Sequence, residues 1–149
     1  METRQYKPES EAETLLLGYE FASNLKPGDT IAMYGELGSG KTQFIKGLCK
    51  YFKVGEIVTS PTFTIINQYF GTIGSNDITI YHIDLYRIKN IQELEEIGFV
   101  DCLMCRDAIK IVEWAEKADE YLRKANFVVR IKPSELDEDT RQFSIEIRK

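Results

Sequence analysis

The chain has 149 residues, of which 43% are hydrophobic and 29% charged, so it is long enough for one soluble domain with a full core. A net charge of −5 and a pI near 5.0 argue against a free-standing nucleic-acid binder, which would usually present a basic face. No apolar run approaches the length of a membrane span, and residues 1–10 are polar, so we expect neither a spanning helix nor a secretory signal.

The first predicted element is a helix that begins after Ser10 and ends near Asn24. Ser10 and Glu13 form an S-x-x-E capping box, which is typical of a helix N-terminus. The face expected to be buried is the one on which these residues recur at helical spacing: Ala12, Leu15, Leu16, Tyr19 and Ala22. A turn over residues 25–29 follows, and the apolar run 30–34 predicts a buried strand.

Residues 35–42 match the P-loop pattern G-x-x-x-x-G-K-[ST], which binds phosphate. The glycines allow backbone turns that aim several N–H groups at one point, and the following helix N-terminus adds a partial positive charge. Lys41 is then expected to reach the β- and γ-phosphates, and Thr42 to offer its hydroxyl to Mg²⁺. A simple linking turn is the alternative, but the flanking strand and helix and the Lys-Thr pair favour nucleotide binding.

The P-loop leads into a predicted helix over residues 41–51. Its apolar side chains recur at helical spacing: Phe44, Ile45, Leu48 and Phe52. After a turn at residues 53–56, a short strand is predicted to begin at Ile57 and Val58. Pro61 fixes the local backbone, so the segment around Thr62 is a strand edge or an ordered loop.

Residues 64–70 and 78–86 predict the two strands of an antiparallel hairpin, with a loop at residues 71–77. Alternation along the second strand separates two faces, one with Ile78, Ile80, His82 and Asp84, and the other with Tyr81, Ile83 and Leu85. The later elements predicted are a short helix at 91–97 ending at Gly98, a strand at 108–112, a helix at 117–124, and strands at 127–131 and 143–147.

These elements predict an α/β fold: a single P-loop domain over residues 1–149, with a mixed central sheet and helices on both faces. The parallel strands are expected to hold the P-loop, and the hairpin to add antiparallel strands. The order of the strands does not follow from the sequence.

ATP hydrolysis also requires an acidic group for the metal and a group that orients a water molecule. Asp84 and Glu113 both stand near strand ends, and at least one of them is expected to serve the metal. Thr62 is a candidate sensor of the γ-phosphate, although a plain turn threonine is the favoured interpretation from spacing alone. His82, the single histidine, is expected to be packed or hydrogen-bonded rather than catalytic.

Three cysteines, an odd number, do not predict a disulfide framework and fit a reducing, cytoplasmic setting. Cys102 and Cys105 form a lone C-x-x-C. A zinc site would need two more ligands, for which the sequence offers only Cys49 and His82, so ordinary packing thiols are favoured.

Four motifs follow one another along the chain: G-E-L-G-S-G-K-T at 35–42, S-P-T-F-T at 60–64, H-I-D-L-Y-R at 82–87 and V-E-W at 112–114. In this order they resemble the TsaE family, also called YjeE, which comprises small bacterial ATPases of tRNA threonylcarbamoyladenosine synthesis. The P-loop alone is shared by a vast superfamily, whereas the other three motifs together are far more specific. The resemblance extends to about Trp114 and is looser after Glu116.

This resemblance implies an accessory ATPase that uses ATP and Mg²⁺, is weak alone, and joins a complex with TsaB and TsaD. TsaD transfers the threonylcarbamoyl group to adenosine, so tRNA is contacted through the complex. The catalytic residues implied are Lys41, Asp84 and Glu113, with Thr42 and Glu113 on Mg²⁺ and Asp84 orienting water or in the outer metal shell. The nucleotide contacts expected are Glu11, Gly38, Ser39, Gly40, Lys41, Thr42, Gln43 and Thr62.

Two other functions remain open at this point. A small-molecule kinase would share this size and loop, and Asp84 would then act as the base for a hydroxyl acceptor. Alternatively, ATP binding would only stabilise one conformation of a binding module, without any need for turnover. The choice of ATP over GTP follows mainly from the resemblance, and the sequence carries no N-K-x-D guanine signature.

Overall fold

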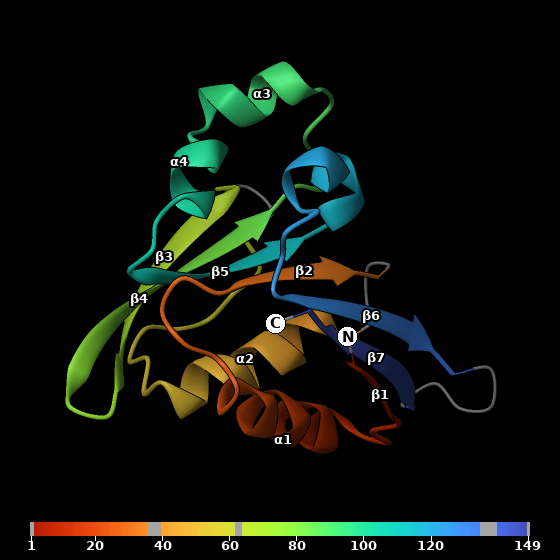
Figure 1. Cartoon of the computed structure of the whole chain (residues 1–149). Helices are drawn as coiled ribbons and strands as arrows, with labels where there is room; N and C mark the ends of the chain where they lie inside the picture. The colour runs from red at the N-terminus through yellow and green to blue at the C-terminus, as the bar shows by residue number, and fades with distance from the viewer. Residues whose placement is uncertain (1, 36–39, 62–63, 135–139, 149) are drawn as a thin grey trace.

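A computed structural model describes residues 2–35, 40–61, 64–134 and 140–148, which form one seven-stranded sheet with helices on both faces (Figure 1). The elements are β1 (Glu2–Tyr6), α1 (Glu11–Ala22), β2 (Thr30–Tyr34), α2 (Lys41–Tyr51), β3 (Ile66–Ile73), β4 (Asn76–Asp84), α3 (Ile91–Glu96), α4 (Phe99–Leu103), β5 (Ala108–Glu113), the 3₁₀ helix η1 (Ala115–Tyr121), β6 (Phe127–Pro133) and β7 (Arg141–Ile147).

The sheet is mixed, as predicted, and its strand order is β1-β7-β6-β2-β5-β4-β3. The P-loop strand β2 lies at the centre and pairs in parallel with β5 on one side and β6 on the other, while β4 pairs in parallel with β5. Antiparallel pairs finish both edges: the β3–β4 hairpin at one, and β7 with β1 at the other. The carboxyl ends of β2, β4, β5 and β6 therefore meet along one edge of the sheet.

Helices α1 and α2 cover one face of the sheet, and α3, α4 and η1 lie on the other (Figure 1). Each layer encloses its own apolar cluster, because alternate strand residues point to opposite faces. The first cluster includes Phe44, Leu48 and Ile80, and the second includes Ile83, Phe99 and Val112. The predicted faces of β4 and the predicted buried side of α2 are both confirmed. No helix in the described ranges is both long and apolar enough to cross a membrane.

The buried face of α1 agrees with the predicted one at Ala22 but not at Leu16 and Tyr19. Leu16 and Tyr19 were expected inside, but they are 52% and 40% exposed. The residues that α1 buries are Thr14, Gly18, Phe21 and Ala22. Its start agrees with the prediction, since Ser10 Oγ accepts from the Glu13 N–H at 3.1 Å, although the Glu13 carboxylate accepts from the N–H of Glu9 rather than of Ser10.

Two glycines explain the orientation of α1. A Cβ atom added at Gly18 would lie 2.0 Å from the backbone oxygen of Phe44, and one added at Gly47 would lie 1.9 Å from that of Leu15. Helices α1 and α2 therefore touch backbone to backbone at these positions. Glycine contributes no apolar side chain to the helical pattern. The prediction from that pattern therefore placed the interface with α2 on the wrong side of α1.

Several element boundaries were also wrong or missed. Residues 57–58 form no strand, although Val58 is buried. The hairpin loop expected at 71–77 is only a two-residue turn at residues 74–75, because Gly74 adopts the left-handed conformation (φ 60°) that allows β3 and β4 to continue to it. The helix expected at 117–124 is a 3₁₀ helix that begins earlier. Strand β1 and helix α4 were not predicted.

The three cysteines are free thiols. Burial raises the pKa of Cys49 to about 12 and also raises the pKa of Cys102, so neither thiol is activated as a nucleophile. Among the residues that the structure describes, no group of three or more His, Cys, Asp or Glu side chains is arranged to hold a metal ion.

Candidate functional site

The candidate site lies where the carboxyl ends of β2, β5 and β4 meet. Gly35 follows the end of β2, Glu113 ends β5 and Asp84 ends β4. Glu113 is the register partner of Met33 on one side and of Asp84 on the other. The alternation of the strands points both carboxylates to the face that α2 covers, so they lie beside the start of the P-loop helix.

Lys41 is the first residue of α2 and is only 5% exposed. Its Nζ donates to the backbone oxygen of Gly35 at 2.7 Å and lies 4.5 Å from the centroid of the Trp114 ring. Burial lowers the pKa of Lys41, while the negative charges of Glu113, Asp84 and Glu116 oppose this change. A partly desolvated ammonium group therefore stands next to the two carboxylates.

Gly40 caps the N-terminus of α2 with a left-handed backbone (φ 100°), which a residue with a side chain rarely adopts. The cap residue itself makes no side-chain hydrogen bond to the first N–H groups of this helix. Arg141, the first residue of β7, lies alongside: a Cβ atom added at Gly40 would be 3.6 Å from the Arg141 Cγ. Arg141 was not predicted as a site residue, because β7 lies about a hundred residues after the P-loop in the chain.

Glu113 is almost fully buried and is held by His82. Its Oε2 lies 2.6 Å from His82 Nε2, and the relative exposures of the two side chains are 3% and 0%. The expectation that His82 would be packed and hydrogen-bonded is confirmed, but its partner was not predicted. His82 precedes Asp84 by two residues on β4, so one strand supports both carboxylates.

Asp84 is held by the segment that follows α2. Ser60 Oγ donates to its Oδ2 at 3.1 Å, and the Tyr86 N–H donates to its Oδ1 at 2.9 Å. The backbone N–H of Asp84 donates to the oxygen of Ile65 at 2.8 Å. Residues on both sides of position 62 therefore contact Asp84.

The remaining predicted site residues lie around the start of α2. Thr42 is half-buried in its first turn. Gln43 Nε2 donates to the Glu11 carboxylate at 3.4 Å, which places the start of α1 beside the start of α2. The predicted nucleotide contacts Gly38, Ser39 and Thr62 lie outside the residues that the structure describes.

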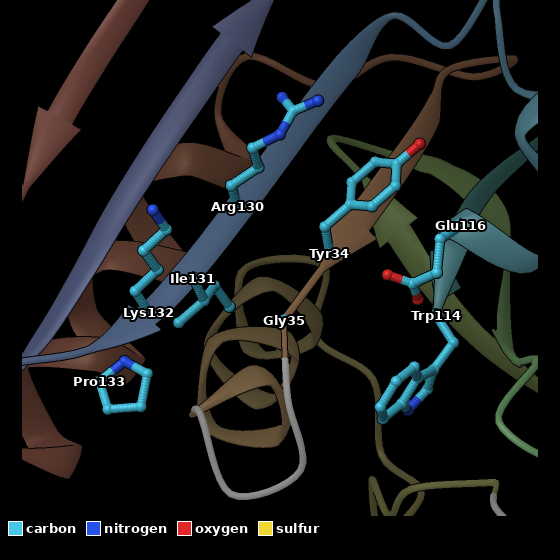
Figure 2. Close-up of a pocket in the computed structure, with 8 residues that line it drawn as sticks. All are labelled: Tyr34, Gly35, Trp114, Glu116, Arg130, Ile131, Lys132 and Pro133. Carbon is cyan, nitrogen blue, oxygen red and sulfur yellow. The ribbon is translucent and has the colours of Figure 1, made fainter.

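A cavity of about 440 Å³ adjoins Gly35. Figure 2 shows Gly35 between the segment after β5, with Trp114 and Glu116, and the end of β6. The lining residues are Tyr34, Gly35, Trp114, Glu116, Arg130, Ile131, Lys132 and Pro133. Burial and a 2.7 Å hydrogen bond to Asp119 raise the pKa of Tyr34 to about 12, so Tyr34 keeps its proton. Trp114 forms a cavity wall and packs on Tyr86 with ring centroids 5.0 Å apart.

The donors at this edge suit a magnesium–nucleotide complex. Mg²⁺ prefers hard oxygen ligands and in such sites takes one or two carboxylates together with substrate phosphates. Asp84, Glu113 and the Thr42 hydroxyl are oxygen donors, and the nitrogen of His82 is already engaged with Glu113. The start of α2 and the Lys41 ammonium are groups that favour an anion.

Comparison with known proteins gives a consistent result. The family described as "Threonylcarbamoyl adenosine biosynthesis protein TsaE" matches residues 8–143. Two proteins named "tRNA threonylcarbamoyladenosine biosynthesis protein TsaE" are similar over 138 residues: one from Rickettsia conorii, 36% identical, covering 91% of this chain and 74% of the relative, and one from Bacillus subtilis, 33% identical, covering 93% and 83%.

A solved structure shares the fold. The chain titled "Crystal structure of Bacillus subtilus YdiB" superposes with a TM-score of 0.74 at 27% sequence identity, covering 98% of this chain and 86% of that one. The similarity thus extends through β6 and β7, where the motifs of the sequence are weakest.

Proposed function

This chain belongs to the TsaE family of threonylcarbamoyl adenosine biosynthesis proteins, and from that premise we propose that it binds and hydrolyses ATP in support of tRNA modification. Its role is in the biosynthesis of N6-threonylcarbamoyladenosine in tRNA, as the names of its relatives state for them. The hydrolysis of ATP, the Mg²⁺ requirement and the partner subunits are the parts that go beyond the family assignment.

One observation carries the ATPase proposal: a buried ammonium group and two buried carboxylates converge beside the N-terminus of α2. Lys41, Asp84 and Glu113 come from three different elements and are 5%, 3% and 2% exposed. Burying three ionisable groups together is unfavourable unless they are paired or serve a ligand. A triphosphate with its metal would use both signs of charge.

Each residue then has a defined task. The N–H groups at the start of α2 and the Lys41 ammonium bind the phosphate oxygens and offset charge that develops during phosphoryl transfer. Thr42 and Glu113 are the ligands that would hold Mg²⁺, which when bound neutralises charge on the β- and γ-phosphates. Asp84 orients the attacking water, since Ser60 and the Tyr86 N–H fix its carboxylate.

The tRNA substrate is bound by the partner subunits in this proposal. We propose that TsaB and TsaD form the complex that this chain joins, and that TsaD carries the chemistry on tRNA, as the family resemblance implies. The net charge of −5 supports an arrangement in which another subunit holds the tRNA. Turnover by this chain alone is then slow and rises in the complex.

The test is phosphate release from ATP by the purified protein, alone and with TsaB and TsaD. We expect slow release alone, stimulation by the partners, and loss of both in Lys41→Ala. Release equal to that of Lys41→Ala in the presence of both partners would contradict the ATPase proposal. A phosphorylated metabolite as the product would instead support the kinase alternative.

A further inference from the structure

His82 is the centre of a buried chain of polar contacts that no part of the proposed reaction requires. One ring nitrogen, Nε2, lies 2.6 Å from Glu113 Oε2, and the other, Nδ1, lies 3.4 Å from the hydroxyl of Tyr69. His82 is 0% exposed and Tyr69 is 3% exposed. A buried imidazole with both nitrogens in contact is fixed in orientation, because rotation would leave a polar atom unpaired.

Tyr69 continues this chain to the segment after α2. Its hydroxyl donates to the backbone oxygen of Thr59 at 3.1 Å and accepts from the Thr59 N–H at 3.4 Å. Asn67 Nδ2 lies 3.3 Å from both the Tyr69 hydroxyl and the Thr59 oxygen. Thr59 and His82 Nδ1 share the one hydroxyl of Tyr69, whose proton is donated to the Thr59 oxygen, so a change in either contact moves the oxygen atom that the other contact uses.

The contacts of Asn67 reach the other side of position 62. Thr64 Oγ1 donates to Asn67 Oδ1 at 2.9 Å. The contacts that start at Glu113 therefore end at Thr59 and at Thr64, whereas Asp84 contacts Ser60 directly. Both carboxylates of the site are connected to the same segment, one directly and one through two intermediate side chains.

We propose that His82 and Tyr69 are positioning residues that couple the carboxylate of Glu113 to Thr59. The inference rests on the proposed function, since it gives Glu113 a role on Mg²⁺. A change at Glu113 is transmitted to Thr59 through these side chains, and a change at Thr59 alters the position of Glu113. Such coupling is reciprocal for binding free energies, so it can be measured from either end.

The first experiment uses the ligand-free protein and follows amide hydrogen exchange at Thr59 by NMR. Glu113→Gln, which weakens the bond to His82, is expected to speed exchange at Thr59 by about fivefold, the lower range of ordinary coupling. In a Tyr69→Phe background, Glu113→Gln is expected to have no further effect on this exchange. If Glu113→Gln leaves exchange at Thr59 unchanged, the coupling does not exist. This experiment needs neither ATP nor turnover, so its outcome is independent of the ATPase test.

The second experiment measures ADP affinity with and without Mg²⁺ by calorimetry. Tyr69→Phe is expected to reduce the gain in affinity that Mg²⁺ gives by about 2- to 10-fold, the worth of one hydrogen bond, without changing affinity in the absence of Mg²⁺. Tyr81→Phe is the matched control, because Tyr81 lies on β4, the strand that pairs with the strand of Tyr69, but packs in the opposite cluster. A purely structural role would lower the melting temperature and leave the Mg²⁺ gain equal in both variants, which would overturn the proposal.

His82→Gln provides the third comparison. A glutamine amide can still donate to Glu113 from near the Nε2 position, but it has no atom at the Nδ1 position to meet Tyr69. In His82→Gln, the increase in ADP affinity caused by Mg²⁺ is expected to be reduced to the same extent as in Tyr69→Phe. If this variant fails to fold, Tyr69→Phe, which removes one oxygen atom, still decides the question.

Discussion

Asp84 and Glu113 are register partners on neighbouring parallel strands, so their carboxylates leave β4 and β5 at the same level and on the same face. Their surroundings nevertheless differ. Glu113 is held by an imidazole, whereas Asp84 accepts from a hydroxyl and a backbone N–H. Two adjacent carboxylates with different partners can take different tasks, and this difference leads to the first two predictions.

Asp84→Asn is expected to lower ATP hydrolysis in the complex by about 100-fold, since general-base or water-orienting groups typically contribute on that scale. ADP binding and the Mg²⁺ concentration at half-maximal rate should stay within about twofold of wild type. Steady-state kinetics and calorimetry check this. If tRNA modification survives in this variant while hydrolysis is lost, turnover is not needed and the binding-module alternative applies.

Glu113→Gln is expected to act on the metal instead. The Mg²⁺ concentration at half-maximal rate should rise by about tenfold or more, because a neutral amide replaces an anionic ligand. Titration of hydrolysis with Mg²⁺ measures this, and Glu116→Gln, an acidic residue of the cavity wall, serves as the control. An unchanged Mg²⁺ dependence would assign the direct metal contact to Asp84.

Lys41→Met is expected to abolish nucleotide binding and yet to stabilise the ligand-free protein near pH 7. Burial lowers the folded-state pKa of Lys41 below its ordinary value of 10.5, so the unfolded chain binds more protons between these two values. In this pH window the free energy of unfolding of the wild type therefore rises with pH. The stability advantage of Lys41→Met over the wild type becomes smaller in the same window.

Urea unfolding at about pH 7 and at about pH 10 tests this, with Lys46→Met, an exposed position on the same helix, as the control. Lower stability of Lys41→Met than of wild type at pH 7, or an advantage that grows with pH, would show that the ammonium group stabilises the folded protein. A functional lysine retained against stability is a common pattern at binding sites.

The sequence predicted the parts of this fold that local chemistry determines. The P-loop, the strand before it and the helix after it follow from a contiguous motif, and the hairpin face that carries His82 and Asp84 follows from strict alternation. The order of the strands could not be predicted from the sequence, because the pairing of β2 with both β5 and β6 depends on contacts between segments far apart in the chain.

The charged residues of the site were predicted from the sequence, but the hydrogen bonds between them and their neighbours were not. Asp84 and Glu113 were identified from strand ends, yet the contacts of Glu113 with His82 and of Asp84 with Ser60 join different elements. Arg141 was missed for the same reason. Short-range patterns indicate which side chains are candidates, whereas tertiary packing decides which of them meet.

Arg141→Met is expected to weaken binding of ATP with Mg²⁺ by about tenfold, because the side chain lies beside Gly40 at the start of α2, where the phosphates are proposed to bind. Methionine keeps most of the aliphatic packing and removes the charge. Calorimetry measures the affinity, and Arg148→Met, just beyond the opposite end of β7, is the control. Equal affinities of the two variants would exclude Arg141 from the nucleotide site.

Gly18→Ala and Gly47→Ala are expected to destabilise the protein by about 2–4 kcal/mol each, which is large for the addition of one methyl group. Each new Cβ would meet a backbone oxygen of the facing helix, at 2.0 Å from Phe44 and at 1.9 Å from Leu15, so relief requires the helices to separate. Because α2 carries Lys41 at its N-terminus, nucleotide affinity should fall together with stability.

Gly55→Ala is the control, since nothing lies within 4 Å of its added Cβ, and it should be neutral or slightly stabilising. Thermal unfolding compares the three variants, and a change below about 0.5 kcal/mol at Gly18 and Gly47 would mean that α1 and α2 do not pack through these glycines.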